Sequence, residues 1–335
     1  MKLSRRDFLR LSALGLGSAL ITACGMDEAL PTPDPTAAPT HTHLPATQVP
    51  AVPTATSASE ILHGMGFDAF AGKVNTYQDE QYLYVESDGM PEHPMMIGIT
   101  SWQQQVPLPQ FYTGNNAWRI PLNPVLAENP VSATNNLFRG AIALAVNGVP
   151  IFNALNNRGE DAYLAGELDE WGGHSGRADD YHYHVAPLHL QDKVGSGSPI
   201  AYALDGFPIY GSTEPDGSPM GELDQYNGHF DAHGNYHYHG TNSYPYINGG
   251  MRGVVTVQNE QIEPQPRTQP IRPHLQPLKG AVITDFQELG NGAYSLEYTL
   301  NGQKGYVNYR VSGNTYTFEF LDAAGNKTVE TYTNS

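Results

Sequence analysis

Short runs of alternating apolar and polar residues dominate the chain between residues 60 and 262. Runs such as QYLYVES, PMMIGIT, AIALAVNG and RGVVTVQ are β-prone and are bounded by glycine, proline or asparagine, which is typical of short strands. Apolar residues at helical spacing do not continue for a useful length, and only PLNPVLAEN suggests a turn of helix. The pattern therefore predicts a mainly β domain over residues 60–262.

The pattern changes after a second proline-rich segment, residues 263–279. In residues 280–335 the motifs GNG, NGQKG, SGN and AAGN separate five alternating segments, which predicts a small antiparallel β-meander. This C-terminal module has no histidine and its acidic residues are scattered. We therefore assign it a structural role or the docking of a protein partner.

The first 24 residues have the features of an export signal rather than of a folded segment. Arg5 and Arg6 precede an apolar run that is too short to span a bilayer, and their spacing resembles a twin-arginine signal. The run ends in Ile-Thr-Ala-Cys, which resembles a lipobox and would make Cys24 the lipidated first residue of the mature protein. The alternative is an ordinary cleaved secretory signal. Residues 25–59 are rich in proline and threonine and predict an extended linker.

These features predict an exported lipoprotein that its lipid anchors to the extracytoplasmic face of a membrane. The chain has 34 acidic and 17 basic side chains, a net charge of −17, which argues against binding to nucleic acid or to anionic lipid. A single cysteine provides neither a disulfide framework nor a thiolate metal site. Any metal that stabilises the fold must therefore be held by nitrogen and oxygen ligands.

The β domain contains an internal duplication. LDEWGGHSGRADDYHYH (residues 168–184) aligns without a gap with LDQYNGHFDAHGNYHYH (residues 223–239), and upstream ALAVNGVPIF matches AYALDGFPIY. The repeats therefore span residues 143–184 and 201–239. Each contains a Gly-His pair followed, after six variable residues, by Tyr-His-Tyr-His.

The spacing of the repeated histidines suggests metal binding. In a strand, residues two apart lie on one face about 6.5 Å apart, so the two histidines of each tetrad share a face and the tyrosines share the other. The histidine of the preceding Gly-His pair could supply a third nitrogen. The candidate ligands are His174, His182 and His184 in the first repeat and His229, His237 and His239 in the second.

Three imidazoles with an open position suit copper, zinc or iron better than calcium or magnesium. Asp169 and Asp224 lie where a carboxylate could accept a ring N–H and fix the tautomer of a ligand. The spacing leaves open whether the repeats form one shared site or two. The alternative is that these histidines are ordinary half-buried residues of a β protein.

These repeats, with YPYINGGMRG after the second, resemble the YHYH domain of exported proteins over residues 82–257. The resemblance implies that ESDGMPEHP corresponds to the family's N-terminal Gly-x-Pro-x-His segment, which adds His93 as a seventh candidate ligand. At positions where many members carry cysteine, this chain has Trp171 and Tyr226, so a disulfide at those places is absent.

The sequence supports three hypotheses of function. The first is an exported lipoprotein that binds a transition metal, copper or zinc first and iron as a third option. The second is a metal-dependent hydrolase or oxidoreductase in which a carboxylate such as Asp205 acts as base. The third is a structural or interaction protein without metal. Motifs of serine hydrolases, zinc proteases and phosphate loops are absent, so the sequence names no substrate.

Overall fold

The computed structural model describes residues 65–334 and has a mainly β architecture, which confirms the predicted fold class. Arg5, Arg6, Cys24 and the first proline-rich segment lie outside the described residues, so the export signal and lipid anchor stay predictions. Within residues 65–334, no helix is long and apolar enough to cross a membrane.

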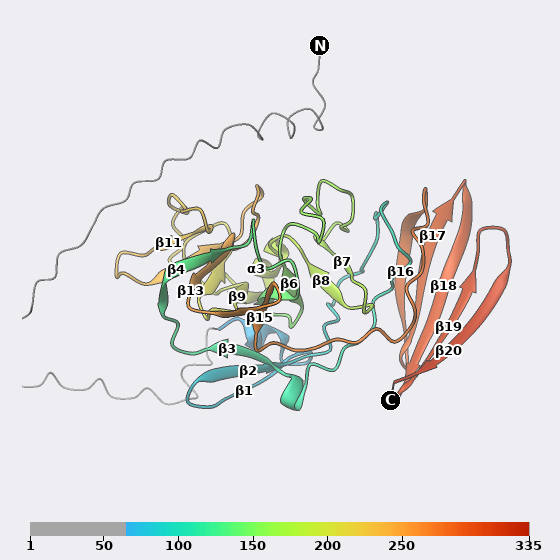
Figure 1. Cartoon of the computed structure of the whole chain (residues 1–335), viewed down its shortest axis with the longest axis horizontal. Helices are drawn as coiled ribbons and strands as arrows, with labels where there is room; N and C mark the ends of the chain where they lie inside the picture. The colour runs from blue at the N-terminus through green and yellow to red at the C-terminus, as the bar shows by residue number, and fades with distance from the viewer. Residues whose placement is uncertain (1–64, 335) are drawn as a thin grey trace, which may run out of the picture. The chain divides into compact units, whose positions relative to one another are not determined.

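An eight-stranded sheet forms the centre of the duplicated region, with the order β11-β12-β10-β9-β5-β6-β8-β7 (Figure 1). Its strands are β5 (Ala141–Ala145), β6 (Pro150–Phe152), β7 (Gly173–Ser175), β8 (Tyr181–Tyr183), β9 (Ala201–Ala203), β10 (Pro208–Tyr210), β11 (Gly228–Phe230) and β12 (Tyr236–His239). β5 and β9 pair antiparallel at the middle. From this central pair toward each edge, the strands of the two repeats follow in the same order, β5-β6-β8-β7 and β9-β10-β12-β11. Each repeat therefore forms one half of the sheet.

Both halves have the same connections. Each half begins with an antiparallel hairpin, β5–β6 or β9–β10. The second strand of this hairpin pairs parallel with the last strand of the half, β8 or β12. The last strand then pairs with the strand before it, β7 or β11. Tight turns at Gly148 and Gly206 close the first hairpins with φ values of 82° and 97°, which favour glycine. β5 and β9 are buried along their whole length, so they form the core of the domain.

Smaller elements surround this sheet. They are a three-stranded sheet of β1 (Asn75–Gln78), β2 (Tyr82–Glu86) and β3 (Trp118–Pro121), the pair β4 (Leu126–Ser132) and β13 (Gly250–Gly253), the pair β14 (Thr256–Gln258) and β15 (Gln261–Glu263), and the short helices η1 (Phe67–Phe70), η2 (Gly114–Asn116), η3 (Leu188–Leu190) and α3 (Gln191–Val194). The predicted strands in QYLYVES and AIALAVNG are therefore present as β2 and β5.

Two local predictions are wrong. PLNPVLAEN forms no helical turn, because its two prolines disfavour helix before them and Leu126 onward pairs as β4 with β13. PMMIGIT forms no strand, since Met96 and Gly98 have φ values of 70° and 91° and turn the chain. Met95, Met96 and Ile99 are nonetheless buried, so the apolar run indicated burial correctly and strand geometry incorrectly.

The C-terminal residues form the predicted antiparallel meander. Its five strands lie in chain order: β16 (Val282–Gly290), β17 (Ala293–Leu300), β18 (Gln303–Ser312), β19 (Thr315–Leu321) and β20 (Lys327–Thr333). In the second proline-rich segment, the buried Arg272 donates to both carboxylate oxygens of Asp179 at 2.8 Å, and its guanidinium lies 4.8 Å from the Phe318 ring centre. This segment is therefore attached both to the duplicated domain and to the meander.

Candidate metal centres

Each half of the central sheet brings three histidines together. In the β7–β8 hairpin His174 lies opposite His182, and in the β11–β12 hairpin His229 lies opposite His237. The last histidine of each tetrad, His184 or His239, projects from the same face because it is two residues further along. We call the group of His174, His182 and His184 cluster A, and the group of Glu214, His229, His237 and His239 cluster B.

The Nε2 atoms of cluster A point toward one another. The Nε2 atom of His184 lies 3.2 Å from that of His182 and 3.1 Å from that of His174. These spacings resemble the distance of about 3.3 Å between two nitrogens of a tetrahedral zinc site, which follows from Zn–N bonds of about 2.05 Å. Cluster A could therefore hold a metal ion.

Backbone carbonyls orient two of these rings. The Nδ1 of His182 lies 2.9 Å from the Asp180 carbonyl oxygen, and the Nδ1 of His184 lies 2.5 Å from that of Asn153. A carbonyl oxygen only accepts, so each Nδ1 must carry the proton, and a neutral ring then has a lone pair on Nε2. Without a cation or proton between them, these converging lone pairs would repel one another.

Burial keeps the cluster A rings in the neutral form. Burial, helped by the neighbouring imidazoles, lowers the pKa of His174 and of His182 well below the usual value, and burial also lowers that of His184. The Phe152 ring stacks on His182 at a centroid distance of 3.9 Å and shields it from water. Neutral imidazole is the form that binds metal ions.

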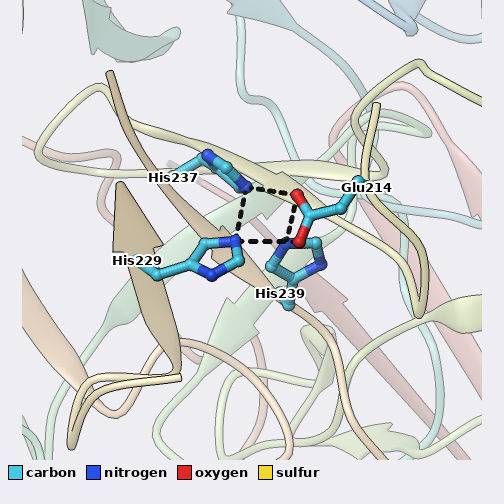
Figure 2. A group of neighbouring side chains, drawn as sticks. All are labelled: Glu214, His229, His237 and His239. Carbon is cyan, nitrogen blue, oxygen red and sulfur yellow. Dashed lines mark hydrogen bonds and ion pairs between the residues drawn. The ribbon is translucent and has the colours of Figure 1, made fainter. Parts of the chain in front are cut away.

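Cluster B has a fourth ligand group, the Glu214 carboxylate (Figure 2). Its Oε1 lies 3.1 Å from the Nε2 of His229, and its Oε2 lies 3.1 Å from that of His237 and 3.5 Å from that of His239. The Nε2 atoms of His229 and His237 are 3.0 Å apart. Three nitrogens and one carboxylate oxygen form a complete ligand set for a tetrahedral ion.

The protonation of cluster B also suits a cation. His239 is completely buried, its Nδ1 lies 2.8 Å from the Gly211 carbonyl oxygen, and its Nε2 has no hydrogen-bond partner among the described residues. Burial lowers the pKa of His239. Burial alone would raise the pKa of Glu214, but bonds from the Gly221 amide and from His237 outweigh it and lower that pKa. Glu214 is therefore a carboxylate at neutral pH.

Glu214 was missed by the sequence reasoning because it lies in the loop where the repeats differ in length. Its structural counterpart in the first repeat is Asn156. The Glu214 amide donates to the carbonyl oxygen of Ser218 at 3.0 Å, and the Asn156 amide donates to that of Glu160 at 2.8 Å. Aligning PIFNALN with PIYGSTE would have identified this pair.

The predicted role of the aspartates is wrong. Asp169 accepts from the Tyr181 hydroxyl at 2.8 Å, and Asp224 accepts from the Tyr236 hydroxyl at 3.0 Å. Neither receives a bond from a ring N–H of the clusters, since strand alternation turns the tyrosines, and not the histidines, toward the Leu-Asp turn. The ring N–H groups of His182, His184 and His239 face the backbone carbonyls described above instead.

Asp205 also interacts with a tyrosine. It is buried, accepts from the Tyr238 hydroxyl at 2.6 Å and from the Gly253 amide at 2.8 Å, and so is not placed to act as a base at either cluster. Its counterpart in the first repeat is Asn147, which donates to the Tyr183 hydroxyl at 3.1 Å. The tyrosine face of each tetrad is thus a buried hydrogen-bond network.

His93 joins neither cluster. Its Nε2 lies 2.8 Å from the Tyr183 hydroxyl and its Nδ1 lies 2.8 Å from the Pro94 carbonyl oxygen, while its ring stacks on Trp171. His189 packs edge-on against the same two rings, His93 and Trp171. Burial lowers the pKa of His93 and of His189 to about 4. His93 therefore supports the tyrosine face of the first repeat.

The two clusters lie at opposite ends of the sheet. The order of strands puts β6, β5, β9 and β10 between β8 and β12, so these strands are separated by five spacings of about 4.8 Å, or about 24 Å along the sheet. Figure 1 shows β7 and β8 on one side and β11 on the other. One ion cannot contact both clusters, so a single site shared by the two repeats is ruled out and any bound metal would occupy separate sites.

A cavity of about 460 Å³ adjoins cluster A, whose three histidines form part of its wall. Its wall also contains Asn156, Glu167, Asp180 and the arginines Arg139, Arg158, Arg177 and Arg267. Glu167 is buried and is held by Arg158 and by the Asn156 amide group, 3.3 Å away. Cluster A thus faces a cavity with both polar and apolar walls that could admit a small molecule.

The comparisons with known proteins agree with the duplicated motifs. A family model described as "YHYH protein" matches residues 117–219, which include the whole first repeat and Glu214. Searches of curated proteins and of solved structures found no match. The predicted resemblance to this family is confirmed over the matched residues.

Proposed function

We propose that this protein, which carries a YHYH domain, binds one transition-metal ion at each of its two histidine clusters. The observation that supports this most directly is the convergence of Nε2 atoms, 3.0–3.2 Å apart in neighbouring pairs. Backbone carbonyls bind the Nδ1 atoms of His182, His184 and His239 and so turn the Nε2 lone pairs toward the centre of each cluster. A cation removes the repulsion that this arrangement otherwise creates.

Zinc or copper is the proposed metal. Nitrogen donors disfavour calcium and magnesium, and the absence of cysteine from the clusters disfavours metals that need thiolate. Three histidines with one glutamate match the ligands and tetrahedral geometry that zinc accepts, while copper binds imidazole more tightly at equal availability. Iron is a third option with the same donors.

The proposal also includes the location of the protein. The Arg5–Arg6 pair, the apolar run and Cys24 support export and lipid anchoring, so the metal-binding domain would act on the extracytoplasmic face of a membrane. Its task there would be to hold, buffer or transfer the metal. Replacing Cys24 by serine should release the protein from the membrane fraction with its metal content unchanged; a variant that stays membrane-bound contradicts the anchor.

A second candidate function is metal-dependent hydrolysis, and cluster A favours it. Catalytic zinc sites have three protein ligands and an open position, whereas structural sites have four. Cluster A has three histidines beside a cavity, and cluster B has four ligand groups. Hydrolysis of nitrophenyl esters by the zinc-loaded protein, lost in His184→Ala, would support this function.

Elemental analysis tests the main proposal. The full chain is purified without a histidine tag, supplied with zinc, dialysed and measured beside His184→Ala, His239→Ala and the control His233→Ala, whose side chain is exposed and outside both clusters. We expect about two ions per chain in the wild type and in the control, and about one in each cluster variant. The same measurement is repeated with copper, and a wild type that retains neither zinc nor copper refutes the proposed binding.

A further inference from the structure

We propose that a metal ion at cluster A keeps one coordination position for an external oxyanion, and that the adjoining cavity binds a small organic molecule with a carboxylate or phosphoryl group. This inference rests on the proposed metal binding at cluster A. It distinguishes the two clusters, which the duplicated sequence would otherwise make equivalent.

The first argument is the fourth ligand. In cluster B the Glu214 carboxylate lies 3.1 Å from the Nε2 atoms of both His229 and His237. At the equivalent backbone position the first repeat has Asn156, which has no negative charge. No carboxylate of the described residues joins the three histidines of cluster A.

Two polar groups of the cavity wall, Asn156 and Glu167, are already engaged. The Asn156 Oδ1 accepts from the amides of Arg158 at 2.9 Å and Glu160 at 3.1 Å, which closes its own turn. Its Nδ2 donates to the Glu167 carboxylate at 3.3 Å, and Arg158 forms an ion pair with the same carboxylate. Neither Asn156 nor Glu167 can turn to the histidines without breaking these bonds. The fourth position of cluster A is therefore left to a molecule from the cavity.

The second argument is charge. The chain carries a net charge of −17, yet the cavity wall contains four of its 17 basic residues and only two carboxylates, Glu167 and Asp180. Arg139, Arg158 and Arg267 have acidic partners, whereas the exposed Arg177 forms no ion pair with any residue that the structure describes. Arg177 is thus a guanidinium group in the cavity wall whose charge no ion pair with a described residue neutralises, and it favours an anionic ligand.

Chemistry and size narrow the class of ligand. Guanidinium groups bind carboxylates and phosphoryl groups through paired hydrogen bonds, and the oxygens of the same groups coordinate metal ions. A cavity of about 460 Å³ has the size of a typical small-molecule site. Arg177 and the three histidines of cluster A line the same cavity, so an anionic molecule bound there has both a guanidinium group and the metal position in its walls.

Cobalt(II) makes the coordination visible, and inorganic phosphate serves as the probe. The full chain is loaded with cobalt and freed of unbound metal, and its visible spectrum is recorded as phosphate is added. We expect two cobalt ions per chain and a saturable phosphate-dependent change from one of them. His184→Ala, which retains only cluster B, should show no such change. Arg177→Gln should weaken phosphate binding about tenfold, as expected for one charge-assisted hydrogen bond.

A substitution that gives the first repeat the residue of the second repeat tests the fourth coordination position of cluster A directly. Asn156→Glu gives cluster A the residue that cluster B has, so cobalt should stay bound and the response to phosphate should disappear. The control Asn135→Glu adds the same charge at an exposed residue outside the cavity wall and should respond as the wild type does.

The outcomes separate this inference from the proposed function. Two bound cobalt ions with a spectrum that phosphate does not change refute the oxyanion site and leave metal binding intact. A phosphate response that persists in His184→Ala or in Asn156→Glu also refutes the assigned position. Failure of the wild type to bind cobalt at cluster A refutes metal binding there, and the oxyanion site with it.

Discussion

Tyr238→Phe tests whether the tyrosines of the tetrads have a structural role on the face opposite the histidine clusters. The Tyr238 side chain is completely buried and its hydroxyl makes two hydrogen bonds. It donates to Asp205 at 2.6 Å and accepts from the Arg252 amide at 2.7 Å. Phenylalanine keeps the ring and removes both bonds, so the variant isolates the hydroxyl.

The cost follows from the groups that lose a partner. Asp205 is buried and would keep only the amides of Gly253 and Phe207 as donors. Losing a hydrogen bond to a carboxylate costs about 1.5–3 kcal/mol, and leaving the Arg252 amide without a partner costs about 1–3 kcal/mol more. We expect the free energy of unfolding to fall by about 3 kcal/mol.

Urea denaturation of the metal-loaded protein, followed by circular dichroism, measures this change, and elemental analysis is run on the same sample. Tyr244→Phe is the control, because its half-exposed hydroxyl lies 3.4 Å from the Thr134 hydroxyl; its effect should stay within about 0.5 kcal/mol. Tyr238→Phe should retain about two ions per chain. A loss of stability below about 1 kcal/mol, or the loss of one ion, would show that the Tyr238 hydroxyl does not stabilise the fold independently of the metal.

Three further predictions concern the metal, the pH and the buried ion pair. Chelation should lower the thermal midpoint of unfolding, since a metal bound only to the native state at 100 times its Kd adds about 2.7 kcal/mol; an unchanged midpoint argues against structural metal. Because burial lowers the pKa of His93 and of His189 to about 4, these two rings bind fewer protons in the folded metal-free protein than in the unfolded chain between pH 6.5 and pH 4. Their contribution to stability should therefore be full above pH 6.5 and be lost toward pH 4, so His189→Phe should lose less stability than the wild type over this range in urea titrations; an equal loss contradicts the assignment. Arg272→Ala leaves the buried Asp179 without its partner and should cost about 3–5 kcal/mol in urea unfolding, whereas the exposed Arg139→Ala should cost less than about 0.5 kcal/mol.

Several features of the site follow from local geometry and could be predicted from the sequence. A strand alternates its side chains, so Tyr-His-Tyr-His must place its histidines on one face whatever surrounds it. The repeated Gly-His before each tetrad predicted the third nitrogen, and the hairpins bring His174 and His229 opposite His182 and His237. The meander was equally predictable, because its turns and alternation are local signals.

Other features depend on residues that are distant in the chain. The carboxylates of Asp169, Asp224 and Asp205 lie near the tetrads as expected, but only the packed fold decides that they bind tyrosine hydroxyls. The PMMIGIT run has the composition of a strand, yet the fold uses it as a buried turn. Burial depends on composition, whereas strand geometry also needs a neighbouring strand to pair with, and the sequence does not show that neighbour.

By itself, the sequence determined the β class, the duplication and the two sets of three histidines, because each of these is a pattern repeated along a strand or between two copies. Tertiary structure decided that the sets lie about 24 Å apart along the sheet and that their fourth positions differ. Glu214 and Asn156 occupy equivalent turns, but only the fold shows that the Glu214 carboxylate lies among the histidines of its repeat, whereas the histidines of the first repeat face a cavity. Such contacts join segments that are distant in the sequence and form only when the chain folds. This is the physical reason why the sequence did not show the difference between the two clusters.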